Sequence, residues 1–344
     1  VAPSPQHPFD PEERMIRDVQ AEHLALELKP LRLVELEIGD RDPLVEDWLA
    51  AISELVEQRH HSLIALAPAL PIVAVDPLRR SVVAHEWGTF TAVAAEDGKP
   101  IQWRPILSSD LPCFVERDGP FNPKGMSSTF VRMETPVIYF YAPSPAVVDV
   151  RVDFPHGRMT EWYPKATTRS NTQLIWNAVR IDPRESGELP ASKGASHYFA
   201  ARETDAAPVR VNGQVEKLLF YRGVGNFDVP IEAKFLGDGR LRVRNTGSAA
   251  LPVAFYFENR EGRVAYRVAR DVSREIVWES PKGLDNLVSI QQALQAELTL
   301  AGLFPKEAAA MIETWRDAWF ESGTRVIYLV PKELVDKVLP LQIA

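Results

Sequence analysis

The chain has 344 residues and a formal net charge of −8, and 45% of its residues are hydrophobic. This composition is sufficient for a sizeable core and excludes a disordered chain. The acidic balance argues against a nucleic-acid-binding protein, which needs a basic face. The single cysteine excludes an internal disulfide and a CxxC motif. The sequence predicts no transmembrane helix, because it has no run of about 18 apolar residues.

Residues 1–76 are predicted to be mostly helical. An Asp-Pro pair at residues 10–11 is a helix start, because the aspartate caps the first turn and proline fits its first position. The same pair recurs at residues 42–43. Apolar residues at helical spacing follow both pairs, and the first series reaches Leu26. Between the two helices, residues 31–38 are compatible with a short strand.

Residues 63–74 form an apolar segment that follows two histidines and ends in alanine. This layout is similar to the hydrophobic region of a signal peptide, although it lies about sixty residues into the chain. If it is an export signal, residues 1–60 lie upstream of the true start, and the mature protein is extracytoplasmic, either periplasmic or secreted. A buried connector broken by two prolines is the alternative, and a cytoplasmic location goes with it.

Residues 82–280 are predicted to be β-structure. Residues 147–154 alternate between apolar and charged side chains, which is typical of a strand with one buried face. Turn signals at residues 237–239 and 259–262 each separate two short apolar runs, as in hairpins. The 28 prolines outnumber the 18 glycines, which favours a loop-rich β protein. Short strands at regular spacing predict a β-sandwich-like antiparallel core.

Residues 284–344 are predicted to form a helical hairpin and a final strand that pack on this core. Apolar residues three or four apart line one face of residues 287–298. Pro305 then opens a second helix, and Gly323 stops it. Residues 325–330 follow as a strand.

The predicted fold is therefore α+β. It has three regions, which are a helical N-terminal region at residues 1–76, a β-rich core domain at residues 82–280 and a helical C-terminal region at residues 284–344. No repeat of 20–50 residues is present, so a solenoid or propeller is not expected.

Several catalytic motifs are absent from the chain. It has no Gly-x-Ser-x-Gly nucleophile elbow and no Gly-x-x-x-x-Gly-Lys phosphate loop. His85 and Glu86 begin like the helical zinc-protease motif, but Thr89 stands where the second histidine is needed. No motif therefore names a reaction.

Three histidines in the β region are candidate metal ligands or bases. Each belongs to a cluster of His or Glu beside an aromatic residue, at a predicted strand end or in the loop after it, where sites are usually built. Two imidazoles and one carboxylate would hold one divalent transition metal. The three candidates are His85, His156 and His197.

Three glutamates of the same clusters are candidate catalytic groups or further ligands. A pair of carboxylates performs general acid/base work, as in glycoside hydrolysis. Aromatic neighbours would stack on a sugar ring. The glutamates are Glu86, Glu134 and Glu161, and the aromatic residues are Trp87, Trp162 and Tyr163.

A purely structural interpretation of the same clusters is also open. Glu134 and Glu161 can form ion pairs with Arg132, Arg158 or Arg222 across neighbouring strands. The tryptophans can belong to the core. In that case the clusters lie scattered through the fold.

Five segments resemble motifs of an uncharacterised family of exported bacterial proteins. The resemblance covers residues 84–342 and implies an exported protein whose His-Glu-Trp-Gly run lies close behind a signal peptide. It implies no activity and no catalytic residue. The segments are residues 85–91 (His-Glu-Trp-Gly-Thr-Phe-Thr), 133–136 (Met-Glu-Thr-Pro) with 139–141 (Tyr-Phe-Tyr), 160–164 (Thr-Glu-Trp-Tyr-Pro), 220–223 (Phe-Tyr-Arg-Gly) and 315–323.

Three functional hypotheses follow. The first is an exported hydrolase, metal-assisted or carboxylate-dependent, that acts on a glycan or another envelope or extracellular substrate. The second is a non-catalytic module of the cell envelope that binds a small-molecule or glycan ligand or serves assembly. The third is a cytosolic structural subunit. The sequence makes no prediction of the oligomeric state.

Overall fold

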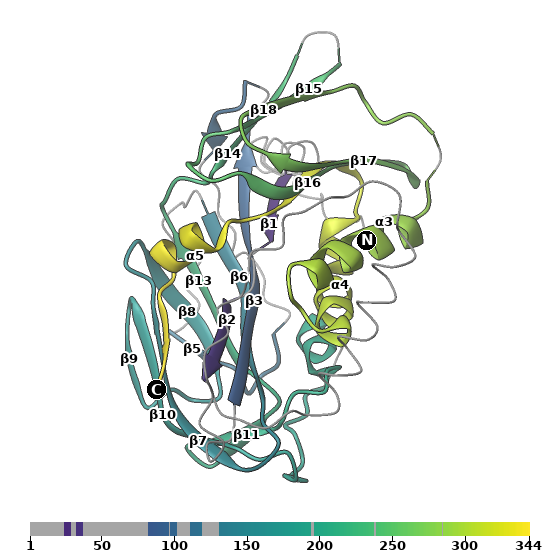
Figure 1. Ribbon diagram of the computed structural model, residues 1–344. Helices are drawn as coiled ribbons and strands as arrows, with labels where there is room; N and C mark the ends of the chain where they lie inside the picture. Colours follow the sequence, from purple (N-terminus) through teal and green to yellow (C-terminus); the bar gives the residue numbers. More distant parts are fainter. Residues whose placement is uncertain are drawn as a thin grey trace, which may run out of the picture.

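The computed structural model describes residues 24–28, 32–36, 82–95, 97–101, 111–118, 131–193, 196–236, 239–283 and 285–344. The predicted helix start at residue 10, the predicted helix after residue 42 and the apolar segment at residues 63–74 lie outside these residues. Figure 1 shows a long twisted sheet with smaller sheets on one side and helices on the other.

The described residues form one large sheet of 11 strands. Its pairings are antiparallel, apart from a parallel pairing between β1 and β19. The order across the sheet is β17 (Arg263–Val272), β16 (Leu251–Arg260), β19 (Gly323–Leu329), β1 (Leu24–Leu28), β3 (Val82–Ala94), β6 (Val131–Tyr141), β13 (Leu219–Gly225), β8 (Gly157–Tyr163) and β5 (Glu116–Arg117), while β2 (Arg32–Leu36) and β4 (Pro100–Ile101) also pair with β3.

Two smaller antiparallel sheets complete the β-structure of the described residues. The second sheet contains β12 (Gln214–Glu216), β11 (Val209–Val211), β10 (Gln173–Ile181), β7 (Ala146–Asp153) and β20 (Leu341–Ile343), with β9 (Thr168–Ser170) paired to β10. The third sheet contains β14 (Ile231–Phe235), β15 (Leu241–Asn245) and β18 (Glu275–Trp278).

One face of the large sheet packs on the two smaller sheets and on α5 (Lys332–Val338). In β7, Val150 and Val152 are buried, whereas Asp149 and Arg151 beside them are exposed, because successive side chains of a strand point to opposite faces. The buried residues of β7 join one hydrophobic cluster with residues of β3, β6, β13, β15 and α5. We call this side of the large sheet its inner face.

The opposite face of the large sheet, its helix face, is covered in part by helices (Figure 1). They are α3 (Leu287–Leu300), α4 (Pro305–Trp319) and the short 3₁₀ helix η2 (His197–Arg202). Asn286 caps α3, because its side chain accepts a hydrogen bond from the backbone N–H of Ser289. A second hydrophobic cluster joins α3, α4 and η2 to residues of β3, β6, β13, β16 and β19.

The prediction of a β-rich α+β fold is confirmed. The C-terminal helices are α3 and α4, and the strand expected within residues 31–38 is β2. The strand expected at residues 325–330 is β19, although α5 and β20 follow it. The prediction for Leu24–Leu28 is wrong, because this segment is strand β1 rather than the end of a helix. Its backbone pairs with β3 on one side and β19 on the other, and this tertiary pairing outweighs the local helical spacing. No helix of the described residues is long and apolar enough to cross a bilayer.

Gly223 of β13 offers a test of how closely the strands approach. A Cβ atom at this position would lie 2.6 Å from the carbonyl oxygen of Arg158 and 2.9 Å from Cε of Met133. We expect Gly223→Ala to lower the free energy of unfolding by about 2 kcal/mol, since overpacking forces the backbone to shift. Urea denaturation measures this loss. Gly187→Ala is the control, because its Cβ would meet only side-chain ends, the nearest being Glu185 Oε1 at 3.1 Å; equal losses in both variants would contradict the prediction.

Candidate functional site

Three neighbouring strand pairings lose register at the same level of the large sheet. The shifts lie between Trp87 and Thr89 in the β3–β6 pair, between Phe220 and Gly223 in the β6–β13 pair, and between Arg222 and Gly223 in the β13–β8 pair. Such β-bulges re-aim side chains and are common next to active sites. The extra residues are in β6, which both β3 and β13 oppose, and in β8, so the line of bulges involves four adjacent strands.

The bulge in β6 moves a carboxylate to the helix face. Ile138 and Phe140 lie in the inner-face cluster, and so do Val131 and Met133 on the other side of the bulge. Odd-numbered residues thus face inward before the bulge and even-numbered residues after it, since one extra residue reverses the alternation. Glu134 consequently stands on the helix face.

Four polar side chains at this level form a row on the helix face, which we call the polar row. They come from four adjacent strands, β3, β6, β13 and β8, and each is at most 7% exposed. Arg222 and Glu161 are direct partners in register, and their neighbours Phe220 and Tyr163 belong to the helix-face cluster. The members of the polar row are Thr91, Glu134, Arg222 and Glu161.

Glu134 is held by an arginine and a threonine. Nη1 of Arg132 lies 2.7 Å from its Oε1, and the hydroxyl of Thr91 donates to its Oε2 over 3.0 Å. The hydroxyl of Thr89 donates to the backbone carbonyl of Glu134 over 3.3 Å, next to the bulge. The negative charge of Glu134 is therefore compensated within the site.

Glu161 has a different environment. It accepts a hydrogen bond from the hydroxyl of Thr160, and Arg222 and Arg117 are its register partners on the two neighbouring strands. Among the residues that the structure describes, Glu161 forms no ion pair with a lysine or an arginine. The two carboxylates of the polar row thus differ in how their charge is balanced.

The polar row is difficult to explain by stability alone. Removing a charged group from water costs several kcal/mol, and well-packed apolar residues can often replace a buried ion pair without loss. The rest of this face buries aromatic and aliphatic side chains. Positions that break such a local rule are concentrated at functional sites. We therefore regard the polar row as the candidate functional site.

Glu86 is not part of the polar row. It is fully buried on the inner face of β3, where its neighbours Ala84 and Phe90 belong to the inner cluster. The hydroxyl of Tyr221 donates a hydrogen bond to its carboxylate. The sheet itself separates Glu86 from the two other predicted catalytic glutamates.

His85 is on the helix face, where it fastens α4 to β3. Its ring is 1% exposed, and Nδ1 lies 2.7 Å from Oε2 of Glu307 in the first turn of α4. Glu307 also accepts hydrogen bonds from the Tyr141 hydroxyl (2.9 Å) and the Phe304 backbone N–H (2.8 Å). Burial, and then the charge of Glu307, raise the pKa of Tyr141, so its hydroxyl stays a donor. The positive end of the helix favours the carboxylate here.

The two remaining histidines lie elsewhere. His156 is exposed in the turn between β7 and β8. His197 opens η2, where its Nδ1 lies 2.9 Å from the carbonyl oxygen of Thr314 and its Nε2 lies 3.4 Å from a carboxylate oxygen of Asp317. Within the described residues, no three His, Cys, Asp or Glu side chains are grouped closely enough to hold a metal ion. The three predicted metal ligands are thus not brought together.

The aromatic residues that were expected to stack on a sugar are core residues. Trp87, Trp162 and Tyr163 are all at most 3% exposed. Trp162 lies in the inner-face cluster, and the other two lie in the helix-face cluster. Their flat faces are covered by protein, so the structure does not support a sugar-stacking role.

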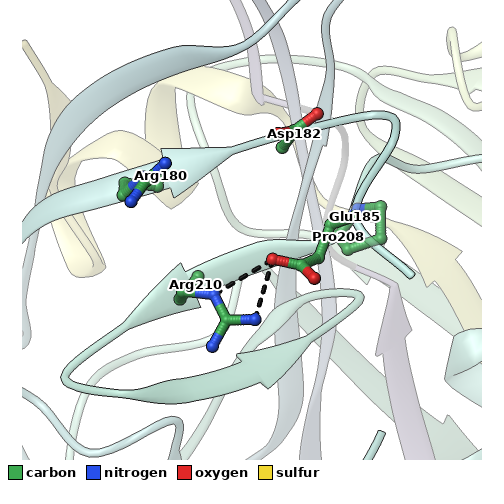
Figure 2. A pocket seen from close by; sticks show the side chains of 5 residues that line it. All are labelled: Arg180, Asp182, Glu185, Pro208 and Arg210. Atoms are coloured by element: carbon green, nitrogen blue, oxygen red, sulfur yellow. Dashed lines mark hydrogen bonds and ion pairs between the residues drawn. The ribbon is translucent and has the colours of Figure 1, made fainter. Parts of the chain in front are cut away.

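A shallow depression on the second sheet carries opposite charges, as Figure 2 shows. Arg180 and Arg210 are register partners on β10 and β11. Glu185 accepts hydrogen bonds from Nε (3.0 Å) and Nη2 (2.8 Å) of Arg210, which lower the pKa of this carboxyl. The carboxylate thus offsets the repulsion between the arginines, and the depression needs no bound anion to explain it.

Sequence reasoning missed Glu307, Tyr141 and Thr91. Glu307 could have been noticed, since a glutamate shortly after a helix start often returns to the backbone of the first turn. Tyr141 and Thr91 carried no such local signal. Their roles depend on residues 166 and 43 positions away in the chain.

The buried carboxylate of Glu307 generates a stability prediction. We expect Glu307→Ala to lower the free energy of unfolding by about 3 kcal/mol, because the buried His85 ring and two partly buried donors lose their acceptor. Chemical denaturation measures the change. Glu313→Ala on the exposed side of the same helix is the matched control, since its ion pair with Arg316 is half exposed, and we expect a change within about 0.5 kcal/mol. Similar denaturation midpoints for the two variants would disprove the role of Glu307.

Comparisons with protein-family models, with curated proteins and with solved structures found no match to this chain. A functional interpretation therefore depends on the geometry of the polar row and on the sequence.

Proposed function

We propose that this protein is an exported hydrolase that cleaves glycosidic bonds with two carboxylates, Glu134 and Glu161, on a β-sandwich-like scaffold. One observation carries the proposal. Both carboxylates are more than nine-tenths buried on the same face of the large sheet, at a line of β-bulges, with Arg222 on the strand between them. Glycoside hydrolysis needs two such carboxylates on opposite sides of the scissile bond.

Their surroundings suggest different roles for the two carboxylates. Glu134 has its charge compensated by Arg132, which suits a carboxylate that accepts a proton from water. Glu161 has a hydroxyl partner and no ion pair with lysine or arginine among the described residues, which suits the proton donor to the leaving oxygen. Arg222 would position the substrate through hydrogen bonds to its hydroxyl groups. The three predicted metal ligands have no part in this scheme.

Export is part of the proposal. The apolar segment at residues 63–74 has the layout of a signal peptide's hydrophobic region. The resemblance of residues 84–342 to exported bacterial proteins supports the same location. An extracytoplasmic glycan is then the substrate class that the protein would meet.

A non-catalytic binding or assembly module of the cell envelope is the second candidate. The observation that favours it is the ion pair between Glu134 and Arg132, together with the full burial of Trp87. In that case the polar row is a structural tie between strands, and its carboxylates would affect stability alone.

Amide substitutions distinguish the two candidates. We expect Glu134→Gln and Glu161→Gln each to lower kcat by roughly 100-fold or more on whichever oligosaccharide or peptidoglycan probe the wild-type protein cleaves, because general acid or base catalysis is lost. Release of reducing ends measures the rate, and thermal unfolding checks the fold.

Glu297→Gln is the matched control for these variants. Glu297 is 8% exposed and pairs with Arg270. The Glu297→Gln variant therefore removes the charge of a carboxylate that is buried to a similar extent but lies away from the polar row. We expect its kcat to stay within about twofold of the wild type. Absence of cleavage by the wild-type protein on every probe, or unchanged rates in both polar-row variants, would leave the non-catalytic module as the better proposal.

Export has its own test. We expect the native protein, purified from its source, to begin near residue 75, because a signal peptidase would remove the apolar segment. Such processing would also remove β1 and β2 and leave β3 and β19 without β1 between them. Amino-terminal sequencing of that protein measures the start. A native protein that retains residues 1–60 in a cytosolic fraction would contradict export without affecting the proposed chemistry.

A further inference from the structure

We infer that this protein inverts the configuration of the anomeric carbon, in a single displacement by water. The inference rests on the proposed function and adds its stereochemical course. It depends on where Glu134 and Glu161 stand in the sheet.

The two carboxylates belong to strands that are not neighbours. Glu134 is on β6 and Glu161 is on β8, and β13 pairs with both. Adjacent strands lie about 4.8 Å apart, so β6 and β8 are separated by roughly 10 Å. Side chains on one face of a sheet stand roughly perpendicular to it. Two glutamates of equal length therefore keep most of this separation at their carboxyl groups.

A separation of roughly 10 Å is close to the longer of the two known geometries of glycoside hydrolysis. Inverting enzymes hold their carboxyl groups about 6.5–9.5 Å apart, which leaves room for a water molecule beside the sugar, whereas retaining enzymes hold them about 5–5.5 Å apart. The side chain of Arg222 stands between Glu134 and Glu161 on the intervening strand, Thr91 of β3 holds Glu134 from the opposite side, and Arg132 holds it from its own strand. The two carboxylates therefore cannot approach to the retaining distance without displacing a buried guanidinium.

The reaction then proceeds in one step. The oxygen of a water molecule attacks the anomeric carbon from the side of Glu134, and its proton passes to the Glu134 carboxylate. The bond between the anomeric carbon and the glycosidic oxygen breaks, and Glu161 transfers its proton to that oxygen. The products are a free sugar of inverted configuration and the released alcohol. The proton that Glu134 gained and Glu161 lost returns through solvent.

The test is a proton NMR measurement on the full-length protein. The probes are peptidoglycan fragments and a panel of soluble oligosaccharides of known anomeric configuration, recorded within minutes, before mutarotation. We expect the first product signal to belong to the anomer opposite to the substrate. A first product of the same configuration would overturn the inference while leaving the proposed function intact.

A second measurement, covalent trapping, distinguishes single from double displacement. For the sugar that is cleaved best, the matching 2-deoxy-2-fluoro glycoside with a good leaving group traps a retaining enzyme as a covalent ester. We expect no mass increase on the protein, whereas an adduct on Glu134 would show double displacement. Absence of cleavage on every probe would overturn the proposed function, and the inference would fall with it.

Discussion

The position of Glu134 in the candidate site depends on a single extra residue in β6. Up to that point β6 presents its odd-numbered residues to the inner face, and beyond it the even-numbered ones take their place. Without the bulge, Glu134 would point into the cluster between the sheets, where Met133 now lies. Gly88 permits this arrangement, because a Cβ there would lie 2.8 Å from the Cα of Pro136. The bulge thus decides whether this carboxylate meets Thr91 at all.

The helix face therefore carries two kinds of buried charge with different consequences. Glu307 accepts three hydrogen bonds and ties the first turn of α4 to His85 of β3, which makes it a fastening between helix and sheet. Glu134 and Glu161 tie no helix to the sheet, and their partners come from the same sheet level. The contact of Glu307 between helix and sheet should contribute to stability. The buried charges of Glu134 and Glu161 within one face of the sheet are better explained by a catalytic role.

Much of the fold could be predicted from local patterns. The alternation in β7, the caps of α3 and α4 and the strand β19 follow from the chemistry of consecutive residues, because each element determines its own exposed and buried sides. Leu24–Leu28 could not be predicted in this way. Its strand conformation depends on β3 and β19, which lie more than fifty and almost three hundred residues away.

The sequence by itself determined that the chain is a β-rich α+β protein and which glutamates and histidines were worth examining. Only the tertiary structure decided which of these residues lie near one another. It placed Glu134 and Glu161 on one face with Arg222 between them, turned Glu86 to the other face, and separated the three histidines. The physical reason is that side-chain direction along a strand has a period of two, so a single bulge reverses it, and no local pattern in this sequence reveals where two distant strands fall out of register.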